Sequence, residues 1–150
     1  MKRFRFPLRP VAVLRAHREM RAREAFAAAV HAYVQAEEAL AAARGRVNDL
    51  ADVLFAGRSG RFLATDAANL FRVYRAECQA AMDAERRSIE LRDAMQQRRS
   101  EYIDSNRQLK VVNRLEDKAR ARHRAENARL EQNELDEFAG YKAAHRPALP

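Results

Sequence analysis

The feature that most restricts the fold is a stretch of 79 residues, from Arg61 to Ala139, that contains neither glycine nor proline. Val11 to Arg44 is also free of both, and Gly45, which follows, costs a helix only about 1 kcal/mol relative to alanine. Among 150 residues there are one threonine and two isoleucines, so the β-branched residues that favour strands are scarce. The chain is therefore expected to be all-α and to consist of long helices.

Glycine and proline also predict where these helices begin and end. Gly57 and Gly60 bracket the only strong break, Pro10 suits a first helical turn, and Thr65 or Asp66 can cap the second helix. Gly140 is a natural C-terminal stop. We expect a single coiled-coil hairpin over residues 1–150, with helix one at about 10–56, a joint at about 57–65, helix two at about 66–140 and a loose tail at 141–150.

Apolar residues recur with alternating gaps of three and four, which is typical of a coiled-coil seam. In helix one the seam is Tyr33, Ala36, Leu40, Ala43, Val47, Leu50 and Leu54. In helix two it is Leu70, Tyr74, Ala81, Ala84, Leu91, Met95, Tyr102, Leu109, Val112, Ala119 and Leu130. Polar residues interrupt this second seam at Glu77, Ser88, Arg98, Ser105, Glu116, His123 and Glu126.

The short joint makes the two helices antiparallel, and helix two is the longer one. Pairing with helix one ends near Leu109 of helix two. About 30 residues of helix two therefore project beyond helix one or meet only the N-terminal segment. An amphipathic helix without a partner indicates a binding surface.

Composition limits both the core and the partners. Hydrophobic residues make up 47% of the chain, but 31 of those 71 are alanine, so only a thin apolar seam is expected. No apolar run approaches the length that spans a bilayer, and the single cysteine, Cys78, rules out an internal disulfide. We expect a cytoplasmic protein, and the net charge of +8 favours an acidic partner.

No group of residues predicts catalysis, a metal or a cofactor. His123 and Glu126 supply only two ligands and are interpreted as a solvated pair, and Ser59 lacks the context of a nucleophile or phosphate loop. A two-helix hairpin also offers no deep pocket. The chain is therefore not expected to be an enzyme.

Two surfaces could bind partners. Residues 1–24 and 98–129 are rich in lysine and arginine, but no nucleic-acid-binding motif accompanies them and acidic residues lie nearby, which does not favour nucleic acid. The hairpin end is apolar and is either a packed tip beneath a folded-back loop or a docking surface. It comprises Leu54, Phe55, Phe62, Leu63, Leu70, Phe71, Val73 and Tyr74.

Three segments resemble the FliJ family, the coiled-coil component of the flagellar type III export ATPase. The strongest is residues 126–139, a charged helix that closes on Leu-Asp-Glu-Phe-Ala. The opening Phe4-Arg5-Phe6-Pro7-Leu8 is similar to the family's N-terminal pattern. Leu70-Phe71 followed by Tyr74 and Cys78 matches its apolar cluster, although the family more often has leucine or isoleucine at the last two positions.

The resemblance implies a stalk that inserts into the hexameric export ATPase, reaches toward the membrane export gate FlhA and handles export chaperones. It implies gate contact through Leu70, Phe71 and Tyr74 and a peripheral place at the inner membrane. We assign ATPase contact to basic and apolar residues near the two termini, namely Leu14, Arg15, Arg18, Arg21, Arg120, Arg122, Arg124, Leu130, Leu135 and Phe138. The alternatives are the equivalent stalk of a virulence-type injectisome and a nucleic-acid-binding or scaffold coiled coil.

Overall fold

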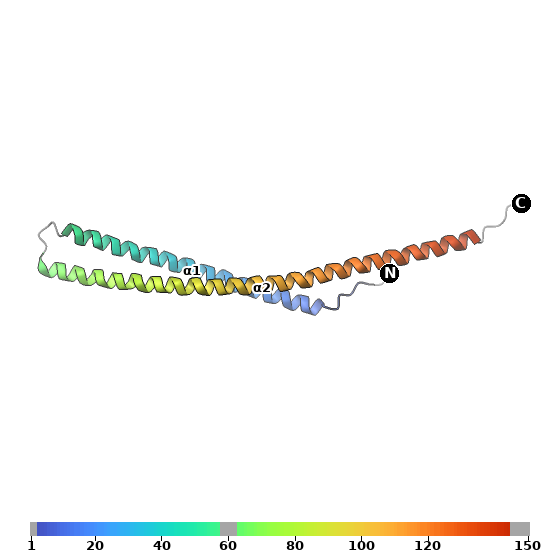
Figure 1. Ribbon diagram of the computed structural model, residues 1–150, viewed down its shortest axis with the longest axis horizontal. Coiled ribbons are helices and arrows are strands. Elements are labelled where there is room, and N and C mark those ends of the chain that lie inside the picture. Colours follow the sequence, from blue (N-terminus) through green and yellow to red (C-terminus); the bar gives the residue numbers. More distant parts are fainter. Residues whose placement is uncertain (1–2, 58–62, 145–150) are drawn as a thin grey trace. The chain divides into compact units, whose positions relative to one another are not determined.

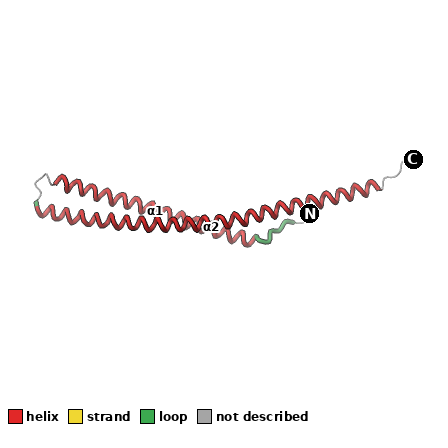
Figure 2. The backbone as a smooth tube through the Cα atoms, viewed as in Figure 1, coloured by secondary structure: helices red, strands yellow, loops and turns green. Residues whose placement is uncertain are grey.

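The computed structural model describes residues 3–57 and 63–144, which form two helices and no strand (Figures 1 and 2). Helix α1 runs over Arg9–Gly57 and helix α2 over Ala64–Ala144. The predicted all-α hairpin with a longer second helix is confirmed. Ser59 and Phe62, together with the end of the predicted tail, lie outside the described residues.

Two helix ends differ from the prediction. The carbonyl of Leu63 accepts hydrogen bonds from the backbone N–H groups of Asp66 (3.0 Å) and Ala67 (3.1 Å), so Leu63, and not Thr65 or Asp66, stands at the N-cap of α2. Asp66 instead lies in the first turn, where its charge complements the helix dipole. Gly140 does not end α2, which continues to Ala144, because no glycine among the described residues adopts the positive φ of a glycine C-cap.

The chain forms two compact units, of which one comprises residues 20–104. In this unit α1 and α2 run antiparallel. The contacts show this, since residues later in α1 meet residues earlier in α2. Phe26 stacks on Tyr102 with 6.0 Å between ring centroids, whereas Arg46 pairs with Glu77 at 2.9 Å. All seven seam positions predicted in α1 are buried or half-buried, as is the predicted α2 seam as far as Tyr102.

The core of this unit is thin. Leu40 and Ala43 are its only buried apolar residues among those described, and Ser88, at 4% exposed, is buried with them. The Ser88 hydroxyl donates a hydrogen bond to Glu37 across the seam, so burying it leaves no unsatisfied polar group. The polar interruption at Glu77 is likewise paired across the helices, with Arg46. The polar residues at these two breaks in the apolar seam therefore bind the opposite helix.

The other unit comprises residues 1–19 and 105–150, and Val112 is its buried apolar residue among those described. Glu19 accepts a hydrogen bond from Asn106 at 3.5 Å, and Arg9 pairs with Glu116 at 3.4 Å, so these segments are antiparallel too. Among the side chains of α2 whose burial is described, the last half-buried one is Asn127, one residue after the predicted Glu126. A straight helix with 3.6 residues per turn drifts in this way against a strict seven-residue repeat.

Candidate functional site

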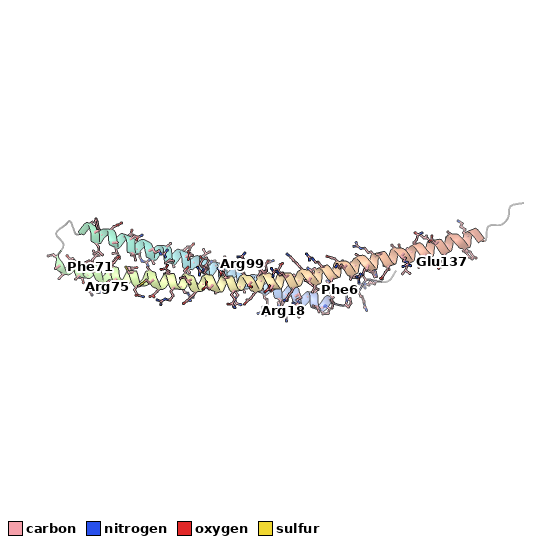
Figure 3. All side chains as sticks on the ribbon, in the orientation of Figure 1. Phe6, Arg18, Phe71, Arg75, Arg99 and Glu137 are labelled. Carbon is pink, nitrogen blue, oxygen red and sulfur yellow. The ribbon has the colours of Figure 1, made fainter. Side chains whose placement is uncertain are left out.

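The first candidate surface joins the end of α1 to the start of α2, and we call it the tip surface; it comprises Leu54, Phe55, Leu70, Phe71 and Tyr74. Leu54, Leu70 and Tyr74 take the half-buried seam positions. Phe71 directly follows Leu70 and therefore points about 100° away from it, which leaves its side chain 55% exposed (Figure 3). Of the three residues predicted for the export gate, two pack in the seam and one faces solvent.

The tip surface is hollowed. An open depression of about 380 Å³ lies on it. Its lining consists of Ala51 and every residue of the tip surface except Leu70. Phe55 on α1 is 76% exposed and forms its other wall. Phe55 is absent from the gate residues assigned from sequence, although its place beside Leu54 in the apolar cluster was the signal that could have identified it. Two exposed aromatic rings from different helices thus flank one apolar hollow.

Tyr74 carries a polar group into this surface. A hydrogen bond with Cys78, one helical turn later, raises the pKa of Tyr74 above its usual 10, and repulsion from the Cys78 thiolate acts in the same direction. The phenol therefore stays neutral at physiological pH. A neutral aromatic ring with one hydroxyl is well suited to an apolar contact that also needs a polar anchor.

The second candidate surface lies where the N-terminal segment meets α2, and we call it the terminal surface; it comprises Phe4, Arg9, Glu116, Arg120 and His123. The Phe4 ring packs edge-on against His123 with 5.4 Å between centroids, and the Arg120 guanidinium lies 5.6 Å from the Phe4 centroid. Open hollows of about 520 and 500 Å³ flank Phe4. Sequence reasoning did not assign Phe4 a role.

Glu116 organises the charges of the terminal surface. Its side chain is only 14% exposed and accepts from Arg120 at 2.8 Å and from Arg9 at 3.4 Å. A carboxylate this shielded from water needs cationic partners, and the chain supplies Arg120 from one turn further along α2 and Arg9 from near its N-terminus. The charge of Arg120 is therefore partly neutralised within the protein.

The predicted ATPase-binding residues do not share one face. Arg120 and Arg124 lie beside Phe4, whereas Arg122 is exposed and lies about 160–200° around α2 from them. Leu14 and Arg18 are exposed on α1 and Arg15 is half-buried, while Arg21 belongs to the unit of residues 20–104. The remaining three, Leu130, Leu135 and Phe138, are 52%, 63% and 65% exposed.

Those last three residues belong to the part of α2 that follows its half-buried Asn127. From Ala128 to Lys142 every side chain is exposed. Leu135, Phe138 and Tyr141 follow one another at intervals of three, so they gather on one side of the helix. This segment presents Leu135 and Phe138 as large apolar groups that stay mostly exposed, at 63% and 65%.

The described residues offer no group of three or more histidine, cysteine, aspartate or glutamate side chains that could hold a metal. His123 is half-buried between Phe4 and Asn127, so its interpretation as a solvated pair with Glu126 is wrong. Neither described helix contains an apolar stretch that could cross a bilayer.

The chain matches a known protein family over nearly its whole length. Residues 4–148 match the family described as Flagellar FliJ protein. No curated protein and no solved structure matches the chain. Because the match covers nearly the whole sequence, the chain belongs to the FliJ family and is a coiled-coil protein of the flagellar export apparatus.

Proposed function

We propose that this protein is a non-enzymatic stalk that connects the hexameric export ATPase to the membrane export gate. The segment 128–142 and the terminal surface enter the ATPase ring, and the tip surface binds the gate protein FlhA. Export chaperones are further partners. Gate binding places the chain on the cytoplasmic side of the inner membrane as a peripheral protein.

One observation carries this proposal. Among the large apolar side chains that stay exposed, Phe55 and Phe71 lie in one region and Leu135 and Phe138 in another, at 55–76% exposure. Leaving such groups in water forgoes about 1.5–3 kcal/mol each, a cost that a partner removes by covering them. A chain with two such regions in two compact units is suited to hold two partners at once.

Family membership supports the flagellar assignment over an injectisome stalk, because the matching family is the flagellar one. The lack of a metal cluster among the described residues neither supports nor opposes the proposal. The exposed aromatic groups and the family match support it together.

The proposal is tested by measuring how the full chain binds purified export ATPase and detergent-solubilised FlhA. Phe71→Ala with Tyr74→Ala should weaken FlhA binding by about 30-fold or more, since losing a central apolar anchor typically costs about 2 kcal/mol. The same pair should leave ATPase binding unchanged, and Leu135→Ala with Phe138→Ala should give the opposite result.

Met82→Ala is the matched control, because Met82 is 52% exposed on α2 and belongs to neither surface. Helicity by circular dichroism accompanies every variant. Loss of helicity together with loss of FlhA binding would show that the tip residues serve packing. If Met82→Ala weakens partner binding as much as the surface variants do, neither surface is specific.

A further inference from the structure

The outward side of α2 in the unit of residues 105–150 carries a row of four cations, of which only one was assigned a role from the sequence. Lys110, Arg114, Lys118 and Arg122 are spaced four residues apart and all four are exposed. We call them the basic row. The seam of the same segment, marked by half-buried or buried Leu109, Val112, Glu116 and Ala119, lies on the other side of the helix.

The basic row is not neutralised within the part of the chain that the structure describes. None of its four members takes part in an ion pair there, although Arg9 and Arg120 of the same unit both pair with Glu116. In the described part of residues 20–104 several arginines on both helices are paired, although Arg75 and Arg99 are not; the paired ones include Arg44, Arg46, Arg86, Arg87, Arg92 and Arg98. The basic row is therefore a run of four consecutive cations that are unpaired within the described chain, spaced four residues apart along one side of α2.

Such a row is unfavourable for the isolated helix. Like charges four residues apart repel, and here three such pairs follow one another. Successive cations rise by about 6 Å along the axis, so the row extends about 18 Å. A partner with carboxylates at matching intervals relieves the repulsion and gains ion pairs at the same time.

We infer that the basic row docks on a protein surface that presents a row of carboxylates. This inference rests on the proposed function, in which the terminal segments of the chain enter the ATPase ring. The wall of that ring then supplies the carboxylates. Arg122 is the only member that the ATPase-binding residues assigned from sequence included.

Three observations favour a protein partner over a phosphate polymer or a lipid surface. Val111 and Leu115 adjoin the row and are 55% and 44% exposed, and a protein covers such apolar groups whereas a phosphate backbone does not. The row also ends one turn before Glu126 and is followed by the acidic stretch of residues 131–137, which would repel a polyanion that followed the helix. No exposed aromatic or long apolar face accompanies the row for insertion into lipid.

The test compares two double charge reversals in the full chain. Arg114→Glu with Lys118→Glu changes the basic row, and Arg75→Glu with Arg99→Glu is the control, since those two arginines are also exposed on α2 and have no ion pair among the described residues (Figure 3). Both variants change the net charge equally. Helicity is measured for each so that an unfolded variant is recognised.

We expect the basic-row variant to bind the export ATPase at least about tenfold more weakly at low salt, mainly through slower association, with the difference shrinking at high salt. The control should bind as the unaltered chain does. Equal ATPase binding by both variants, with the unaltered chain binding normally, overturns the inference and leaves the proposed function standing.

Two further arms separate the other partners. The same proteins are offered vesicles of phosphatidylglycerol and phosphatidylcholine, and a single-stranded RNA oligonucleotide. If the reversal abolishes binding to either of these but leaves ATPase binding intact, the row is a lipid or nucleic-acid site and the inference is wrong. If the unaltered chain does not bind the ATPase at all, the proposed function fails and the inference fails with it.

Discussion

Replacing Leu40 with alanine should loosen the unit of residues 20–104 more than any comparable change on its surface. Leu40 is 7% exposed and is one of only three buried apolar residues in the described chain, the others being Ala43 and Val112. Leucine-to-alanine changes in protein cores cost about 2–5 kcal/mol, and the cost is smallest where the surroundings can collapse. A seam between two helices has water on both sides and can collapse around a smaller side chain. We therefore expect a cost at the low end of this range.

The magnitude follows from these terms. We expect about 2 kcal/mol of lost stability after a few tenths are regained from the higher helix propensity of alanine. Because the chain has two compact units, one melting curve does not isolate the effect. Hydrogen exchange resolves it by residue, and 2 kcal/mol corresponds to about 30-fold faster exchange of the amides near Leu40 and near Ser88, which lies in the same seam.

Val34→Ala is the matched control, because Val34 lies on the same helix and is 46% exposed. It should change exchange by less than about threefold, and amides near Val112, in the other unit, should be unaffected by either substitution. If Leu40→Ala and Val34→Ala accelerate exchange equally, then the thin apolar seam does not stabilise this unit and the reasoning is refuted.

Three further outcomes are expected. Glu116→Gln should expose the N-terminal segment to limited proteolysis, because the charge that pairs with Arg9 and Arg120 is lost; cleavage at the unaltered rate would contradict this. Phe4→Ala should release the same segment with little loss of total helicity by circular dichroism, since Phe4 precedes α1; a large loss would show that Phe4 supports the helices themselves. The pKa of Tyr74 is raised, so its contribution to stability is complete below pH 10 and is lost as the pH rises through the folded-state value. Tyr74→Phe should therefore remove one late step from the tyrosinate absorbance titration and leave stability at neutral pH nearly unchanged.

The sequence by itself determined the helices and the seam. Without glycine or proline over 79 residues the backbone has no local reason to leave the helical conformation, and the heptad spacing fixes which side of each helix packs. Leu40 and Leu54 take their predicted positions for this reason. Both ends of α2 were exceptions, because a capping side chain or a glycine only permits a helix to start or stop at its position and does not compel it.

Only the tertiary structure decided which side chains meet. Arg120 and Arg122 are two residues apart and looked equivalent, yet Arg120 contacts Glu116 and Phe4 while Arg122 remains in the basic row. Arg9 reaches Glu116 from 107 residues away. Helical periodicity predicts that the two arginines face different ways and that Arg120 can reach Glu116 one turn earlier in α2, but the register between the packed segments sets that Arg9 and Phe4 meet the same place. That register depends on contacts between residues distant in sequence, so local propensity carries no information about it.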